Sequence, residues 1–197
     1  VKHSWIDNKI TIAKQEAQES TIYIEPDWSA ASYWYAIVAL AQEGEIRLPG
    51  LKKNSLQGDI AIAEIMEYFG VKTTFEEKGI LLQKIAIDTT KTLFDFKECP
   101  DLAQTVVVIA AAQKRNVSFT GLETLKIKET DRIAALQNEI GKFGATLTED
   151  NEVYHLDSTH VKEPDSISIA TYEDHRMAMA FAPLALVFKD ITIEEPH

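Results

Sequence analysis

The sequence predicts an α+β protein in which helices pack on sheets, because one structural unit recurs along the chain about every 73 residues. An aspartate stands before an apolar helical stretch at Asp27, at Asp101 and at Asp174, with spacings of 74 and 73 residues. A glycine ends a strand-like stretch at Gly50 and at Gly121, 71 residues apart. The apolar spacing within each unit changes from helical to alternating and back, which is typical of short, closely connected helices and strands.

The first unit follows residues 1–26, a segment of strand character in which 9–13 and 21–24 alternate with a period of two. Asp27 is a favoured N-cap and predicts a helix start. Gly70 predicts a helix end, because glycine adopts the left-handed conformation that follows many helices. The elements expected in this unit are a helix to Leu40, a strand 45–48, a helix with apolar positions Ile62, Ile65, Met66 and Phe69, and strands 71–75 and 79–82.

The second and third units repeat this order. The elements expected in the second unit are a helix from Asp101 to Ala112, a strand 117–120, a helix that ends at Phe143, and strands 145–147 and 153–156. The third unit has a helix from Asp174 to Phe188 and a strand 191–194, after which the sequence stops. Pro183 should kink or shorten that helix. Because the third copy is incomplete, we expect the chain to be a piece of something longer.

Composition narrows the class of protein. The 197 residues are 45% hydrophobic and 26% charged, which is typical of a globular protein. The net charge of −11 argues against general nucleic-acid binding and against an anionic membrane surface. Cys99 is the single cysteine, so an intrachain disulfide is excluded. We interpret Cys99 as a small buried residue and not as a nucleophile. No apolar run is long enough to span a membrane and no signal peptide is visible, so we expect a cytoplasmic protein. We also expect a monomer.

The most charged stretch is Leu125-Lys126-Ile127-Lys128-Glu129-Thr130-Asp131-Arg132, which an apolar helical stripe follows at once. The run should therefore lie at the first turn of a helix, where unpaired N–H groups and the macrodipole favour anions. At spacings of three and four residues, Lys128, Glu129 and Arg132 can point toward one place. They predict a phosphate or carboxylate site with an acid or base beside it. The alternative is a solvated amphipathic helix with ordinary ion pairs.

The repeat serves as an internal control on this prediction. Its copies should keep what the fold needs, so the three leading aspartates are interpreted first as helix caps. Lys128 and Glu129, by contrast, stand where the first unit has neutral residues. Similarly, His175 and Arg176 open an otherwise apolar helix, where the earlier units have Trp-Ser and Leu-Ala. Charges are seldom buried without partners, so this pair indicates a site, although an exposed pair at the helix start remains an alternative.

Two long motifs in this chain resemble signatures of the 5-enolpyruvylshikimate-3-phosphate synthase family. They are Lys128-Glu129-Thr130-Asp131-Arg132 and Asp174-His175-Arg176-Met177-Ala178-Met179. The segments beginning at Asp27, Asn54 and Pro100 resemble further family segments in the same order, so the resemblance covers nearly the whole chain. It implies the enolpyruvyl transferase fold, with two domains of three βαβαββ units whose helices pack on mixed sheets. Residues 1–26 would then end the last unit of the other domain, and 27–197 would form most of the second domain, with its third repeat truncated.

The resemblance also implies a reaction. The family transfers the enolpyruvyl group of phosphoenolpyruvate to the 5-hydroxyl of shikimate 3-phosphate, through a tetrahedral intermediate and without metal or organic cofactor. By this resemblance Asp101 is the proton acceptor at the shikimate hydroxyl, and Glu129 is the proton donor to the methylene carbon. A carboxylate in either role changes its protonation during turnover. The scattered histidines have no metal-ligand spacing, so the residues themselves predict no metal site.

The remaining site residues follow from the same resemblance. Lys128 would contact shikimate 3-phosphate, Arg132 and Arg176 would bind the anionic groups of phosphoenolpyruvate, and His175 would line the site. Guanidinium groups suit this task because they pair with carboxylates and phosphates in a bidentate manner. Thr124 stands where the family often has an asparagine, so one substrate hydrogen bond differs.

Three functional alternatives remain at this point. One is the enolpyruvyl transferase that acts on UDP-N-acetylglucosamine, which shares the fold. Another is a non-catalytic, phosphate-binding domain of the same fold. The third, favoured by the two charged motifs, is the shikimate enzyme. In that case the lysine, arginine, serine and glutamine ligands of the other domain are absent from this sequence, as is a lysine segment expected after His197. We therefore expect the 197 residues alone to be inactive.

Overall fold

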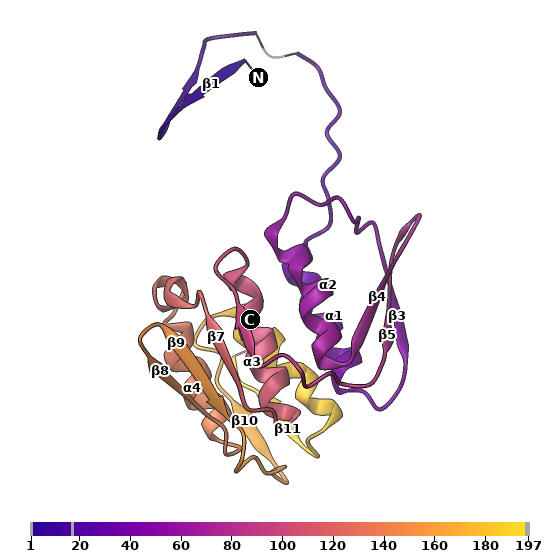
Figure 1. The fold of residues 1–197 in the computed structure, drawn as a ribbon, viewed down its shortest axis with the longest axis vertical. Coiled ribbons are helices and arrows are strands. Elements are labelled where there is room, and N and C mark those ends of the chain that lie inside the picture. Colours follow the sequence, from indigo (N-terminus) through magenta and orange to yellow (C-terminus); the bar gives the residue numbers. More distant parts are fainter. Residues whose placement is uncertain (1, 17, 196–197) are drawn as a thin grey trace.

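The computed structural model describes residues 2–16 and 18–195 and shows an α+β body below an extended N-terminal segment (Figure 1). Three helices form the centre of the body. Two of them are apolar on almost every face, and side chains 103–111 of the second are all buried, as expected for helices enclosed by other layers. The central helices are α1 (Trp28–Leu40), α3 (Ala103–Ala112) and α5 (His175–Phe181).

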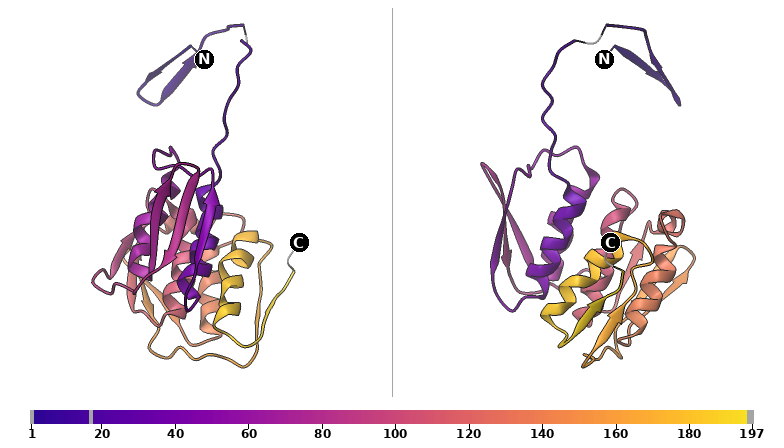
Figure 2. Two further views of the ribbon diagram at one scale, coloured as in Figure 1. Left: turned by 90° about the vertical axis from the view of Figure 1, so that its right-hand side faces the viewer. Right: turned by 180° about the vertical axis from the view of Figure 1, so that it is seen from behind.

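Sheets cover the central helices from the outside. The first sheet is antiparallel, with the strand order β3 (Glu45–Pro49), β5 (Gly79–Lys84), β4 (Val71–Glu76). The left view of Figure 2 shows this sheet in front of the helices. The second is mixed, with order β6 (Leu93–Asp95), β7 (Val117–Thr120), β9 (Val153–Asp157), β8 (Thr146–Asp150), and only β6 and β7 run parallel. The third pairs β10 (Ile167–Ile169) with β11 (Ile191–Ile193) in parallel. Helices on mixed sheets, the predicted fold class, are confirmed.

Shorter helical segments connect these layers. The predicted second helix of the first unit is present in three short pieces, η1 (Gly58–Ala61), α2 (Ile62–Ile65) and η2 (Met66–Phe69). Its counterpart α4 (Arg132–Gly141) is a regular helix whose apolar stripe is buried. The third helix ends early at Phe181, as Pro183 predicts, and continues as a 3-10 turn. The other short helices are η3 (Pro100–Leu102), η4 (Glu123–Ile127) and η5 (Ala182–Leu186).

The three-fold repeat is visible in contacts between equivalent positions. The hydroxyls of Ser32 in α1 and Thr105 in α3 lie 3.1 Å apart, and these residues are separated by 73 positions. Gln104 Nε2 in α3 lies 3.2 Å from Met177 Sδ in α5, again 73 positions apart. Matching positions of successive units therefore meet along the line where the central helices pack together.

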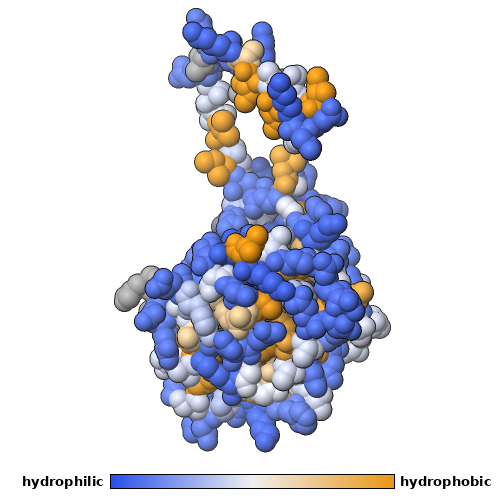
Figure 3. All heavy atoms as spheres, turned by 90° about the vertical axis from the view of Figure 1, so that its left-hand side faces the viewer, coloured by the Kyte–Doolittle hydropathy of each residue, from blue (hydrophilic) through white to orange (hydrophobic). Residues whose placement is uncertain are grey.

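The N-terminal segment contains a small hairpin of β1 (His3–Ile6) and β2 (Lys9–Ile12). Its described side chains are exposed, and Figure 3 shows hydrophobic side chains standing out above the body. The prediction of a strand at 21–24 is wrong: these residues are extended and exposed but unpaired among the described residues. Alternation alone does not make a strand, because a strand also needs a partner for its backbone hydrogen bonds.

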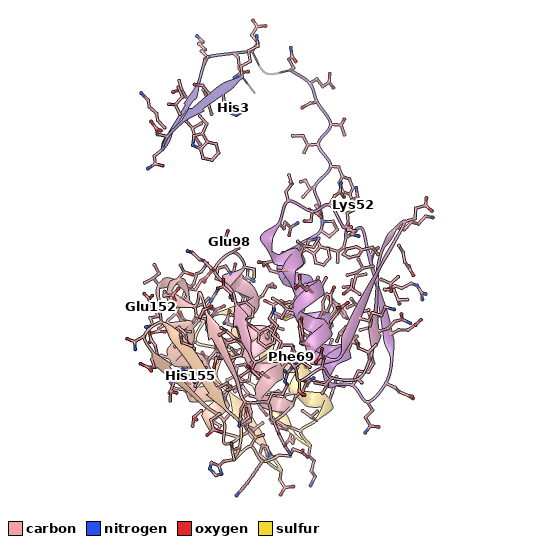
Figure 4. All side chains as sticks on the ribbon, viewed as in Figure 1. His3, Lys52, Phe69, Glu98, Glu152 and His155 are labelled. Atoms are coloured by element: carbon pink, nitrogen blue, oxygen red, sulfur yellow. The ribbon has the colours of Figure 1, made fainter. Side chains whose placement is uncertain are left out.

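Some labelled side chains lie inside the body and others lie on its outside (Figure 4). Phe69 lies inside the body, with the Arg115 guanidinium 4.5 Å from its ring centre. His155 in β9 and Glu152 in the turn between β8 and β9 are exposed. Three strands, β1, β6 and β10, are absent from the sequence prediction.

Candidate functional site

Charged side chains from three helix starts meet around Asp101. One of its carboxylate oxygens lies 3.3 Å from Lys128 Nζ and 3.1 Å from Arg132 Nη1, and the other lies 3.3 Å from Arg176 Nη2. The aspartate comes from η3, just before α3, whereas its cationic partners come from the segments that start α4 and α5. The amino-terminal ends of three helices therefore contribute to one group of ion pairs, which we call the Asp101 cluster.

Arg132 is the buried centre of this cluster, with a side chain only 1% exposed. Its Nε donates to Asp174 Oδ2 at 2.7 Å, Nη1 donates to Asp101, and Nη2 donates to Glu129 Oε2 at 2.6 Å. A buried guanidinium needs such partners, because the loss of its hydration is costly. Carboxylates thus occupy the guanidinium on both edges, so an anionic ligand that contacts Arg132 has to replace one of them.

The helix-cap interpretation is correct for two of the three leading aspartates and wrong for the third. Asp27 accepts a hydrogen bond from Ser29 N at 2.8 Å, and Asp174 accepts one from Arg176 N at 2.9 Å. Asp101 makes no such cap: it lies within η3, whose N-cap is Cys99 and whose first residue is proline. Proline at the first turn needs no partner for a missing N–H. The Asp101 carboxylate is therefore available for the cations.

The expected place of Lys128 and Glu129 on the helix needs correction. Asp131 is the N-cap of α4, and its side chain accepts from Ala134 N at 3.0 Å. Lys128 and Glu129 therefore precede the helix instead of forming its first turn. Both still reach the cluster, Lys128 through Asp101 and Glu129 through Arg132. Their convergence results from the loop between η4 and α4, not from helical spacing.

The cluster determines the charge state of Asp101. Partial burial by itself would raise the pKa of this carboxyl, but Arg176, Lys128 and Arg132 together outweigh burial and hold the pKa below its usual range. Burial disfavours the charge of Arg176, yet Asp101 and Tyr33 reverse this effect and raise the pKa of the guanidinium. In this state Asp101 is a weak base, because its negative charge is already stabilised by three cations.

The other predicted site residues lie at the edge of the cluster. His175 is the exposed first residue of α5, between Asp174 and Arg176. Thr124 is exposed in η4 and is not one of the residues that hold Asp101 or Arg132. The structure thus brings together Asp101, Lys128, Glu129, Arg132 and Arg176, with His175 next to them in the chain.

Sequence reasoning missed two features near the cluster. The sequence predicts Asp174 only as a cap, yet its side chain also forms the most deeply buried ion pair among the described residues, with Arg132. The second feature is Asp59, which accepts a hydrogen bond from Ser29 Oγ; burial raises its pKa, with the Asp101 charge adding to the effect. The signal for Asp174 was its position directly before a His-Arg pair that the other units lack.

The charges of this half of the site balance one another. Lys128, Arg132 and Arg176 face the carboxylates of Asp101, Glu129 and Asp174, so three positive charges meet three negative ones. A ligand with several negative charges would find little net attraction here. Strong binding of such a ligand requires either displacement of carboxylates or further cations from elsewhere. The described residues include no helix that is both long and apolar enough to span a membrane.

Comparison with known proteins identifies the relatives of this chain. A family model described as EPSP synthase (3-phosphoshikimate 1-carboxyvinyltransferase) matches residues 1–197. A 3-phosphoshikimate 1-carboxyvinyltransferase from Bacteroides fragilis is 45% identical over 196 residues, which are 98% of this chain and 48% of the relative. One from Neisseria gonorrhoeae is 33% identical over 176 residues, 89% of this chain and 40% of the relative. The chain therefore spans about half the length of these relatives.

Solved structures share the fold. An EPSP synthase from Acinetobacter baumannii superimposes with a TM-score of 0.71 at 21% identity, over 99% of this chain and 47% of the other. The enolpyruvyl transferase NikO from Streptomyces tendae gives a TM-score of 0.54 at 14% identity, over 89% of this chain and 40% of the other. At these identities the structures establish the fold, and the family rests on the sequence matches.

Proposed function

The chain belongs to the EPSP synthase family, and we propose that it forms the part of a 3-phosphoshikimate 1-carboxyvinyltransferase that carries the Asp101 cluster. The proposed enzyme transfers the enolpyruvyl group of phosphoenolpyruvate to the 5-hydroxyl of shikimate 3-phosphate and releases phosphate. The observation that carries this proposal is the contact of Asp101 with Lys128, Arg132 and Arg176, since these residues come from the motifs that resemble the family signatures.

We assign the chain to one side of a two-domain protein. Residues 27–197 form most of one domain, and residues 1–26 end the other domain, which lies outside this chain. The exposed apolar side chains of the hairpin, among them Trp5, Ile10 and Ile12, support this division, because apolar side chains of a two-stranded sheet are normally covered by another layer. The protein is proposed to act in the cytoplasm as a monomer.

Each residue of the cluster then has a task. Lys128 binds the phosphate of shikimate 3-phosphate, and Arg132 and Arg176 bind the carboxylate and phosphate of phosphoenolpyruvate. His175 lines the same site, and Thr124 takes the place of an amide ligand. These assignments need no metal ion, because the cations that face the substrates are side chains.

Substrate binding also activates the proposed base. When the anionic groups of the substrates take over the cations, Asp101 loses the interactions that keep its pKa low. It then becomes a stronger base at the moment when the 5-hydroxyl lies beside it. Glu129, released from Arg132, becomes free to take up a proton from solvent and to pass it to the methylene carbon, so acid and base are made available by the same binding event.

Replacement of Glu129 by glutamine tests this function. In the full-length protein, the Glu129→Gln variant should retain binding of shikimate 3-phosphate and phosphoenolpyruvate, measured by calorimetry, but lose turnover by roughly 100-fold or more, as typical for loss of a general acid. Glu149→Gln is the matched control, because Glu149 pairs with Lys126 at the same 2.6 Å distance away from the cluster. Unchanged turnover in Glu129→Gln would instead support a non-catalytic phosphate-binding domain.

A further inference from the structure

We propose that Asp174 is a positioning residue that holds Arg132 for the anionic substrate while it caps the helix that carries Arg176. The proposal rests on the proposed function and deepens it, since it names what orients one substrate-binding arginine. Asp174 itself does not touch substrate, because its side chain is fully buried beneath Arg132.

The geometry gives the two oxygens of Asp174 separate tasks. Oδ2 accepts from Arg132 Nε at 2.7 Å, which joins α5 to α4. Oδ1 accepts from Arg176 N at 2.9 Å, which caps α5, and also lies 3.5 Å from Arg132 Nη2. One carboxylate therefore links the two charged motifs of the sequence, and it fixes the backbone of Arg176 as well as the side chain of Arg132.

This arrangement decides which edge of Arg132 is left for a ligand. Asp174 takes the Nε edge from the inside of the body. The opposite Nη groups meet Asp101 and Glu129, whose side chains are 26% and 55% exposed. An incoming anion can replace the half-exposed Glu129 but not the buried Asp174. A planar guanidinium held by one edge offers the other edge in a defined direction, which favours bidentate recognition of a carboxylate or phosphate.

The repeat supplies a matched control. Asp27 occupies the equivalent position in the first unit and caps α1 through Ser29 N, just as Asp174 caps α5. The position equivalent to Arg132 in that unit is Ile60, so Asp27 has the cap without the arginine. A change that spares capping but removes the second acceptor should matter at Asp174 and not at Asp27.

Substitution by asparagine separates capping from the second acceptor role. It is as good an N-cap as aspartate but has a single acceptor oxygen, since its second terminal atom is an N–H donor. Asp27→Asn should keep the cap on α1 and lose only a charge that acts on Arg176 from a distance. Asp174→Asn can satisfy either Arg176 N or Arg132 Nε and must turn its amide N–H groups toward the other donor.

The test uses the full-length protein with phosphoenolpyruvate as the probe. Asp174→Asn should raise the Kd for phosphoenolpyruvate about tenfold or more, as expected for loss of a charge-assisted hydrogen bond, with a matching rise of its KM and little change in the KM for shikimate 3-phosphate. Asp27→Asn should change these constants far less. Equal effects of the two variants would overturn the proposal.

A double-mutant cycle separates positioning from a purely structural role. Arg132→Lys removes Nε, so Asp174→Asn should add little to the Kd in that background. An equal loss of affinity in both backgrounds would show that Asp174 does not act through Arg132. If Asp174→Asn does not fold, Arg132→Lys alone decides, because an unchanged Kd for phosphoenolpyruvate would overturn the proposal. The wild-type protein could bind phosphoenolpyruvate and yet show no turnover. That result would refute the proposed function, but the comparison of affinities between the variants would still be valid.

Discussion

At the scale of single residues, the chain uses carboxylates to keep a buried arginine in place. Arg132 would be expensive to bury alone, and three carboxylates from different segments offset that cost. The same contacts leave Asp101 with three cations and an unusually stable negative charge. Stability and chemistry are thus linked, because the group proposed as a base is also an ion-pair partner of the fold.

This link predicts how the stability of an Asp101→Asn variant depends on pH. Since the folded-state pKa of Asp101 is lowered, its contribution is present above the unfolded pKa of about 3.9 and is lost as the pH falls through the folded value. The variant should therefore unfold at lower urea concentration than wild type at pH 7, and the difference should shrink at pH 3. Asp165→Asn is the control, because Asp165 is 96% exposed and should show little difference at either pH. A difference that grows toward pH 3 would contradict this account.

At the scale of elements, the repeat preserves backbone requirements more strictly than side-chain identity. Gly50 and Gly121 follow equivalent strands and both have positive φ, at 83° and 76°. A Cβ on Gly121 would lie 2.2 Å from Lys97 N, and one on Gly50 would lie 2.8 Å from Pro26 Cγ. Any residue with a Cβ would be strained at these two positions, so glycine recurs at both.

A pair of glycine variants checks this reason. Gly121→Ala should lower the free energy of unfolding by about 1–3 kcal/mol, because alanine is strained at positive φ and its Cβ meets backbone that cannot move aside. Gly141→Ala, at the end of α4, places its Cβ in open space and should be neutral or stabilising by up to about 1 kcal/mol. Urea unfolding of both variants measures the contrast, and equal effects would argue against a backbone origin of the repeat.

At the scale of the whole molecule, the balanced charge of the Asp101 cluster decides what the chain can do alone. The two proposed substrates, which carry several negative charges, would need more positive charge than the three cations here, which are already paired. The relatives are about twice as long as this chain, and a second domain can supply such cations.

We accordingly predict that the isolated 197-residue chain has no measurable transferase activity. Phosphate release from phosphoenolpyruvate in the presence of shikimate 3-phosphate is the measurement, with the full-length protein as the positive control. The isolated chain should also bind phosphoenolpyruvate more weakly than the full-length protein, because the compensating cations are missing. Turnover by the isolated chain would show that the Asp101 cluster is sufficient for catalysis.

Sequence alone determined the repeat, most helices and strands, and the two charged motifs, because these depend on local periodicity and on differences between copies. It could not place the short strands β6 and β10, whose pairing partners are distant in the chain. Only the tertiary structure decided that Asp101 is released from capping, that Arg132 is buried, and that Asp174 serves two donors. Those features depend on which segments meet in space, and the spacing of residues along the chain does not contain that information.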